Sequence, residues 1–329
     1  MSSDFTDNIA DFRPDLVRRR QLVSPAWLAR LTEGRGAAAA PGWLLFEAGC
    51  GGQAQFTLAH IPGAGYLDTG LIEQAPLWNK VSDDALLALL LARGVRHDTT
   101  VVLYGRNNLA AARIAHLLLY AGVRDVRLLD GGFAAWLASG LPCGQGAGPA
   151  AVPADDFGTA FPARPDYMIG TAQVHALLAQ PDGVLASIRS QAEFMGRVSG
   201  YSYIAARGDI AGARWGQAGD DGDVNSMSAY HRDDGCMKPA GEIVQQWQAA
   251  GIAADARVAF YCGTGWRASM AFFYAWLMGW ERISVYDGGW CEWSGDPANP
   301  VVCRSGADQA GDFSAASDAL CRMPSTIRA

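Results

Sequence analysis

The sequence predicts an α/β protein with two tandem domains, each a parallel β-sheet flanked by helices on both faces. Three observations support this prediction: the chain is long enough for two domains, one long segment recurs, and each copy alternates short apolar runs with helical patterns. The 329 residues are 50% hydrophobic, which is enough to fill two packed cores. We therefore expect a soluble, folded protein with two similar halves.

The repeat is the observation that sets the architecture. Residues 94–136 align with residues 251–293 without a gap, with tyrosine on tyrosine and one Asp-Gly-Gly run on another. Upstream, His-Ile-Pro-Gly-Ala at 60–64 corresponds to Asp-Ile-Ala-Gly-Ala at 209–213. Self-similarity of this kind indicates a duplicated structural unit.

The segment between the two copies is rich in Gly, Pro and Ala and shows no apolar periodicity, as is typical of linkers. We therefore predict a first domain at 10–142, an interdomain linker at 143–165 and a second domain at 166–304. The C-terminal tail, 305–329, is rich in small and polar residues, and we expect it to be loosely ordered.

The second copy shows how each unit is built. Residues 258–261 are β-prone, residues 262–267 form a turn, residues 268–278 favour a helix without Gly or Pro, and residues 283–286 are again strand-like. A strand, a helix and a strand with short connections predict parallel strands joined by a right-handed crossover. Helices then cover both faces of each sheet.

Composition and charge argue against several classes of function. The formal net charge is -7, with 33 acids against 26 bases, so we expect no nucleic-acid partner, because backbone phosphates require a clustered basic face. No run approaches the roughly 20 apolar residues of a membrane-spanning helix, so we expect no membrane partner. The polar N-terminus lacks an apolar leader region, which predicts a cytoplasmic protein.

Seven cysteines are scattered through the chain without a C-x-x-C pair. This pattern predicts neither a metal site nor a disulfide framework, since a chain of this size needs no disulfide staples. If one cysteine is chemically active, its local sequence has to show which one.

One loop has the composition of a reactive-cysteine site: Cys262-Gly263-Thr264-Gly265-Trp266-Arg267, between a buried strand and a helix, where ligands usually bind in open α/β sheets. A reactive cysteine must be a thiolate, and N–H groups at a helix N-terminus stabilise its charge. The two glycines let the backbone curl into a nest that would also hold the outer sulfur of a persulfide. Arg267 adds a positive charge, and Trp266 is predicted to form a wall of the site. The alternative is that Cys262 is an inert strand-end cysteine and the glycines only make a turn.

Together with Tyr-Asp-Gly-Gly-Trp at 286–290, Trp293 and the two copies of the upstream run, this loop resembles tandem-domain rhodaneses, the thiosulfate and 3-mercaptopyruvate sulfurtransferases. The resemblance covers about residues 20–304 and is closest to bacterial members with a Cys-Gly-Thr-Gly-Trp-Arg loop. It implies two rhodanese-like domains, a catalytic second domain with Cys262 as nucleophile, and a non-catalytic first domain, in which Gly105 stands opposite Cys262. The loop begins like the mercaptopyruvate branch, but Trp266 and Arg267 replace its Val-Thr, so the donor stays open.

The resemblance also implies substrate contacts. The family's aspartate-x-arginine motif is here Ser-Ile-Arg, so Arg189 either braces the domain or binds the anionic substrate. Glu193 stands where two-domain members often have a substrate-binding arginine, and Arg197 is the candidate substitute. His60 either contacts substrate or bonds a local carbonyl.

As a hypothesis, the Cys262 thiolate attacks the sulfane sulfur of a small anionic donor, thiosulfate or 3-mercaptopyruvate, and becomes a persulfide. A thiol, cyanide or a protein thiol then accepts the outer sulfur, and the cycle needs no cofactor. A cysteine phosphatase of related fold is one alternative, but its Cys-x5-Arg cradle would require arginine at position 268, where the chain has Ala268. The other alternative is a non-catalytic persulfide carrier or docking module for a partner enzyme, which turnover with a small acceptor would distinguish.

Overall fold

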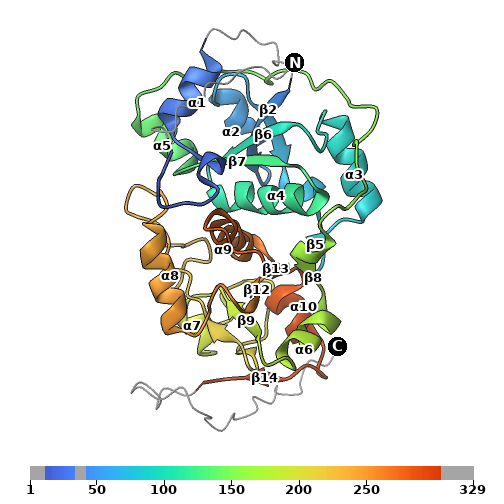
Figure 1. Cartoon of the computed structure of the whole chain (residues 1–329), viewed down its shortest axis with the longest axis vertical. Helices are drawn as coiled ribbons and strands as arrows, with labels where there is room; N and C mark the ends of the chain where they lie inside the picture. The colour runs from blue at the N-terminus through green and yellow to red at the C-terminus, as the bar shows by residue number, and fades with distance from the viewer. Residues whose placement is uncertain (1–11, 34–41, 305–329) are drawn as a thin grey trace.

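The computed structural model describes residues 12–33 and 42–304 and shows two α/β units stacked along the long axis of the molecule (Figure 1). The predicted tail, 305–329, and the first two residues of the predicted first domain lie outside the described residues. From residue 139 to residue 164 the chain contains no helix and no strand longer than an isolated bridge, and the linker bounds stay a prediction.

Each unit is built on a five-stranded sheet. The first sheet contains β1 (Leu22–Val23), β2 (Trp43–Gly49), β3 (Gly65–Asp68), β6 (Thr100–Gly105) and β7 (Asp125–Leu129). The second contains β8 (Met168–Ile169), β9 (Gly183–Ser187), β11 (Arg214–Trp215), β12 (Arg257–Tyr261) and β13 (Ile283–Tyr286). The strand orders are β1-β7-β6-β2-β3 and β8-β13-β12-β9-β11, with parallel pairing throughout. The two orders correspond strand for strand, which confirms the predicted duplication and the predicted α/β class.

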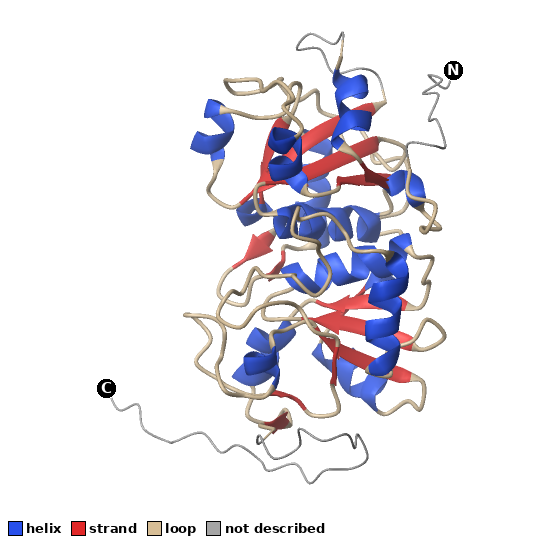
Figure 2. Cartoon of the chain, turned by 90° about the vertical axis from the view of Figure 1, so that its left-hand side faces the viewer, coloured by secondary structure: helices blue, strands red, loops and turns tan. Residues whose placement is uncertain are grey.

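Helices cover both faces of each sheet (Figure 2). The faces that meet between the units carry α3 (Asp83–Ala92), α4 (Asn108–Ala121), α8 (Ala240–Ala249) and α9 (Trp266–Leu277). The outer faces carry α1 (Pro25–Thr32), α2 (Gln53–Leu58) and α5 (Gly132–Ala138) on the first sheet, and α6 (Thr171–Leu178) and α10 (Gly289–Gly295) on the second. The connections include α7 (Gln191–Phe194) and the 3-10 helices η2 (Arg19–Gln21), η3 (Thr69–Leu71) and η4 (Pro165–Tyr167).

Alternation along the central strands distributes apolar side chains between these layers. In β6, Val101 and Leu103 belong to the cluster between the units, whereas Val102 and Tyr104 belong to the outer cluster. This is the period-two pattern of a strand that is buried on both faces. Helices α4 and α9, which are equivalent in the two copies, pack against each other, so the two units share one central core.

Helix ends follow local chemistry. Ser24 and Ser82 accept hydrogen bonds from the N–H groups of Trp27 and Ala85 and so cap α1 and α3. Gly122 ends α4 in the left-handed conformation, with φ of 108°. The second unit departs slightly from the prediction, because α9 begins at Trp266 rather than at residue 268, so Trp266 and Arg267 form the first turn of the helix.

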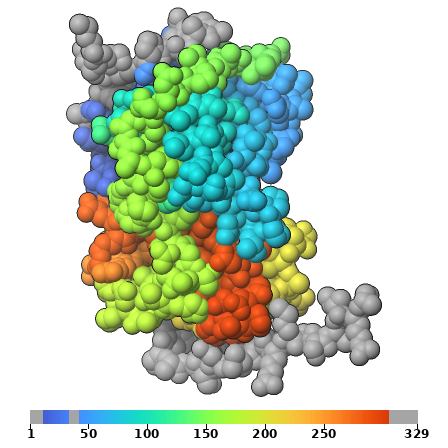
Figure 3. All heavy atoms as spheres, turned by 90° about the vertical axis from the view of Figure 1, so that its right-hand side faces the viewer, coloured from blue at the N-terminus to red at the C-terminus, as the bar shows by residue number. Residues whose placement is uncertain are grey.

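The sequence did not predict two short antiparallel pairs: β4 (Glu73–Gln74) with β5 (Asn79–Lys80), and β10 (Asp209–Ile210) with β14 (Val301–Val302). The β4–β5 hairpin leaves the first unit and lies against the second, where the cyan and orange-red segments meet in Figure 3. The hairpin therefore places residues of the first unit beside α10 and the loop that precedes α9.

Candidate active site

Cys262 directly follows β12, the middle strand of the second sheet, and precedes α9. Its side chain is buried, and its Sγ atom accepts a hydrogen bond from the N–H of Gly265 at 3.2 Å. Gly265 adopts φ of 102°, a left-handed conformation that favours glycine, and this turns its N–H toward the sulfur. The cysteine lies at the carboxyl edge of the sheet, as the sequence predicted, and of the nest of N–H groups expected around its sulfur the described residues show the one from Gly265.

The start of α10 holds the carbonyl groups of the same loop. The N–H of Trp290 donates to the carbonyl of Cys262 at 2.8 Å, and the N–H of Cys291 donates to the carbonyl of Gly263 at 3.0 Å. Gly289 makes this approach possible, since a Cβ at that position would lie 2.5 Å from the Gly263 oxygen. The second Asp-Gly-Gly run therefore fixes the backbone of the cysteine loop.

Two tyrosines that the sequence analysis did not single out contact the loop. The hydroxyl of Tyr201 accepts hydrogen bonds from the Gly263 N–H at 3.2 Å and from Arg267 at 2.7 Å, and burial raises its pKa. The ring centroid of Tyr203 lies 5.5 Å from that of Tyr201. Burial raises the pKa of Tyr203. No motif marked this segment, because the tyrosines stand in a loop without periodicity.

The predicted arginines are engaged by protein partners. Arg267 is buried and forms two bonds to the Glu193 carboxylate, at 2.8 and 2.9 Å. Desolvation raises the pKa of Glu193, but the positive charges of Arg267 and Arg189 outweigh it and hold the pKa below its usual value. Arg189 donates to the carbonyls of Gly208 and Ser199, so it braces the domain. For either arginine to orient a donor, these bonds would have to open, and that role stays a prediction.

Arg197 and His60 occupy different surroundings. The side chain of Arg197 is exposed, four residues beyond Glu193 along the chain. His60 is buried in the first unit, where its Nδ1 lies 2.9 Å from the carbonyl of Phe56 and its ring stacks on that phenyl ring. These contacts match the local-carbonyl alternative for His60.

The first unit contacts the cysteine loop through Glu73, which accepts hydrogen bonds from Trp266 of the second unit. The indole Nε1 donates to both carboxylate oxygens of Glu73, at 3.0 and 2.9 Å. Arg113 of α4 lies between two carboxylates, with Nε at 2.8 Å from Glu73 and Nη2 at 2.5 Å from Asp287. Asp287 also accepts from the N–H of Lys80 at 2.9 Å. The cysteine loop is thus held from both units.

A model of the rhodanese-like domain matches the chain twice, at residues 34–139 and 171–296. The chain belongs to the rhodanese family. Both matched ranges fall inside the two predicted domains, whose boundaries stay predictions.

The rhodanese relatives include named sulfurtransferases. The chain is 52% identical over 284 residues to the thiosulfate sulfurtransferase YnjE of Escherichia coli, covering 86% of this chain and 65% of that relative, so it spans less than two thirds of the relative's length. It is 37% identical over 256 residues to a probable 3-mercaptopyruvate sulfurtransferase of Pseudomonas aeruginosa, covering 74% and 84%. The crystal structure of YnjE superposes with a TM-score of 0.82, at 51% identity, over 87% of this chain and 68% of that chain.

A third comparison concerns persulfide chemistry. A structure of EanB, a protein 34% identical to this rhodanese chain, shows a cysteine persulfide in a tetrahedral intermediate state with ergothioneine. It superposes with a TM-score of 0.83 over 92% of this chain and 75% of that chain. The tyrosine substituted in it precedes the persulfide cysteine by the same interval that separates Tyr203 from Cys262 here. A threonine substituted in another EanB structure has the spacing of Thr264.

The first rhodanese copy lacks the thiol and has filled the equivalent loop. A Cβ at Gly105 would lie 2.5 Å from the Asn107 carbonyl oxygen. Arg106 folds back to pair with Glu47 at 2.9 Å, and its guanidinium covers the ring of Phe133. The loop of the first copy is thus closed around glycine, and the non-catalytic role that the resemblance implies for this copy stays a prediction.

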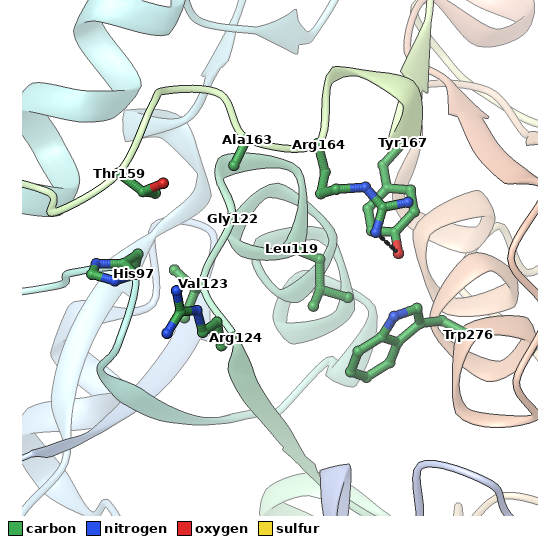
Figure 4. Close-up of a pocket in the computed structure, with 10 residues that line it drawn as sticks. All are labelled: His97, Leu119, Gly122, Val123, Arg124, Thr159, Ala163, Arg164, Tyr167 and Trp276. Atoms are coloured by element: carbon green, nitrogen blue, oxygen red, sulfur yellow. Dashed lines mark hydrogen bonds between the residues drawn. The ribbon is translucent and has the colours of Figure 1, made fainter.

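A cavity of about 350 Å³ lies elsewhere, beside the linker, and the cysteine loop does not line it (Figure 4). Its walls include His97, Arg124, Arg164, Tyr167 and Trp276. Within residues 12–33 and 42–304, no group of three or more His, Cys, Asp or Glu side chains is placed to hold a metal ion. No helix in the described part of the chain is long and apolar enough to cross a membrane.

Proposed function

We propose that this rhodanese is a sulfurtransferase that carries sulfane sulfur as a persulfide on Cys262. Its donor is a small anion, thiosulfate or 3-mercaptopyruvate, and its acceptor is a thiol, cyanide or a protein thiol. The observation that carries the proposal is the Gly265 N–H aimed at the buried Sγ of Cys262, at 3.2 Å, at the N-terminus of α9. This arrangement stabilises a negative sulfur without any added group.

In the first half-reaction the Cys262 thiolate attacks the outer sulfur of the donor. The bond between that sulfur and the rest of the donor breaks, and its electron pair leaves as sulfite or as the enolate of pyruvate. In the second half-reaction an acceptor attacks the outer sulfur of the persulfide, the S–S bond breaks, and Cys262 regains its negative charge. The Gly265 N–H stabilises the anion at both stages.

Tyr203 is the candidate proton-transfer group. Its ring lies beside Tyr201, which bonds the loop at the Gly263 N–H, and Tyr203 and Thr264 have the spacing of the positions substituted in EanB. The side chain is 54% exposed, so it can exchange protons with solvent while it contacts the loop. We propose that the Tyr203 hydroxyl exchanges a proton with the acceptor or with the leaving group.

The arginine contacts weigh against the phosphatase alternative. Such an enzyme needs its loop arginine directed at the phosphoryl group, whereas both terminal nitrogens of Arg267 bond the carboxylate of Glu193. The carrier alternative makes the same persulfide and differs only in its acceptor. Turnover with a small thiol or cyanide therefore separates an enzyme from a carrier.

The test is intact-mass analysis before and after incubation with thiosulfate or 3-mercaptopyruvate. We expect the wild-type chain to gain one sulfur and Cys262→Ser to gain none, while Cys291→Ser, which removes a half-buried thiol next to the loop, still loads. A sulfur gain that persists in Cys262→Ser would overturn the assignment of the nucleophile. If neither donor loads the wild-type chain, the proposed donors are wrong.

A further inference from the structure

The hydroxyl of Tyr201 engages two hydrogen-bond donors of the cysteine loop. It accepts from the Gly263 N–H at 3.2 Å and from Nη2 of Arg267 at 2.7 Å. The ring lies directly on the loop, since a Cβ at Gly263 would lie 2.2 Å from its Cζ atom. Among the described residues the hydroxyl has no hydrogen bond to Sγ of Cys262, whose partner is the Gly265 N–H. The hydroxyl therefore acts on the loop as an acceptor.

Arg267 has a second donor beside the one that Tyr201 accepts. Nη1 and Nη2 each donate one hydrogen to the Glu193 carboxylate, at 2.8 and 2.9 Å, which leaves the second hydrogen of Nη2 for Tyr201. In a planar guanidinium that hydrogen points the same way as the hydrogen on Nε. Nε is buried and has no partner among the described residues. An anion in the place of the hydroxyl would accept from both nitrogens, which is the bidentate arrangement that guanidinium groups favour.

These donors lie close to the reactive sulfur. Burial raises the pKa of Tyr201 and the Arg267 charge lowers it, but a Cys262 thiolate raises it again, which places the sulfur near the hydroxyl. Gly263 directly follows Cys262, and its N–H belongs to the loop that is expected to hold the outer sulfur of a persulfide. Sγ receives the Gly265 N–H, whereas the Gly263 N–H is bound to the tyrosine. The tyrosine thus occupies a donor that suits the outer sulfur.

The segment that carries Tyr201 is built to move independently of the sheet. Residues 195–208, between α7 and β10, contain no helix and no strand. Gly200 precedes the tyrosine at φ of 88°, and a Cβ there would lie 2.4 Å from Oε1 of Glu193, so glycine is the residue that fits. Tyr203, two positions further on, is 54% exposed. A backbone rotation at Gly200 therefore withdraws the hydroxyl from the loop without disturbing a strand or a helix.

We propose that Tyr201 is a placeholder for the outer sulfur of the Cys262 persulfide: its hydroxyl holds the donors of that sulfur in the free protein and leaves them on loading. The outer sulfur then accepts from the Gly263 N–H and from the Nε–Nη2 edge of Arg267, which keeps both bonds to Glu193. The covalent step is that of the proposed function, and the outer sulfur carries the negative charge that these donors stabilise. Because the hydroxyl competes for the donors, it weakens the hold on the sulfur and favours transfer to the acceptor. This role rests on the proposed function and adds a residue that sets how readily the sulfur leaves.

The experiment measures the two half-reactions separately on full-length protein. The rate of loading by thiosulfate or 3-mercaptopyruvate, and the rate at which cyanide then removes the sulfur, are both followed by intact mass. Tyr201→Phe removes the hydroxyl and keeps the ring. Tyr66→Phe is the matched control, because the Tyr66 hydroxyl accepts from the Gly52 N–H at 2.8 Å after β2 of the first sheet, where it bonds no part of the cysteine loop.

We expect Tyr201→Phe to load at least as fast as the wild type and to release sulfur to cyanide about fivefold more slowly, the effect of about one hydrogen bond. Tyr66→Phe should stay within about twofold of the wild type in both steps. A residue that only supports the loop would slow both steps when it is changed, so a loss in both, or an unchanged or faster release, would overturn the placeholder role and leave the proposed function intact. Loading should also raise hydrogen exchange in residues 195–208 of the wild type, and unchanged or lower exchange would show that the tyrosine stays in place. Failure of the wild-type chain to load from either donor would instead overturn the proposed function.

Discussion

Gly289→Ala is the substitution that tests most directly whether α10 holds the cysteine loop in its reactive shape. The added Cβ would lie 2.5 Å from the Gly263 oxygen and 2.9 Å from the Cys262 oxygen, both below the 3.0 Å that real Cβ contacts respect. Both oxygens accept hydrogen bonds from the first residues of α10. The loop must therefore move away from α10 by roughly half an ångström or more, and the Gly265 N–H that bonds Sγ moves with it.

The size of the effect follows from strain and from misplacement. Alanine at φ of 54° costs about 1–2 kcal/mol, and the displaced hydrogen bonds add to the loss of unfolding free energy. A shift of about 1 Å in a reacting group costs about 10²-fold in rate. We therefore expect kcat/KM for persulfide formation to fall between about tenfold and 10²-fold.

The duplication supplies a matched control. Gly132 occupies the equivalent position in the first unit, at φ of 59°, and its Cβ would lie 2.6 Å from the Gly105 oxygen. Gly132→Ala should cost similar stability in thermal melts but leave sulfur loading within about twofold of wild type, because no thiol follows β6. Equal losses of loading in the two variants, or full activity in Gly289→Ala, would refute the argument that backbone placement sets reactivity.

Three further outcomes are expected. Glu193→Gln leaves the buried Arg267 without a counter-charge and should lower the unfolding free energy by about 3–5 kcal/mol in denaturant titrations; a loss below about 1 kcal/mol would show that water reaches the pair. Burial raises the pKa of Asp130 to about 6, so the folded chain keeps that proton to higher pH than the unfolded chain, and stability should fall as pH rises from about 4 to about 6. Asp130→Asn should flatten that slope, and an unchanged slope would assign it to other groups. Gly105→Cys in a Cys262→Ser background should load no sulfur by mass, since the new Cβ meets the Asn107 oxygen at 2.5 Å, and loading there would show that the first loop still opens.

The fold was largely predictable because the same pattern of strands, turns and helices occurs twice in the sequence. Two copies of a strand, a glycine-containing turn and a helix required the same topology twice, and strands β12 and β13 formed where β-prone residues were clustered. The start of α9 was misjudged by two residues, because Gly265 at positive φ ends the turn before Trp266. The β4–β5 hairpin could not be predicted, since its strands are two residues long and its contacts with Glu292 and Asp287 come from the second unit.

The candidate site was predictable only where it is local in sequence. Cys262 and its glycines were found because a thiolate nest is a short motif. The pairing of Arg267 with Glu193, 74 positions apart, depends on tertiary packing, and so does the approach of Tyr201 to the Gly263 N–H. In the sequence, a charged residue in a reactive loop suggests substrate binding. A buried charged residue, however, needs a counter-charge from the protein, and for Arg267 that counter-charge is Glu193.

The first unit has glycine at 105, opposite Cys262, and still contacts the second unit through the two Asp-Gly-Gly runs of the duplication. Asp287 of the second Asp-Gly-Gly run accepts from Lys80 of the first unit, and Asp130 of the first run accepts from the Met237 N–H of the second. Each copy therefore uses its aspartate to hold the other. The contact is asymmetric in one respect: Glu73 of the first unit reaches the helix that follows Cys262 through Trp266. The first unit thus helps to hold the loop that contains Cys262, although it has glycine at the equivalent position.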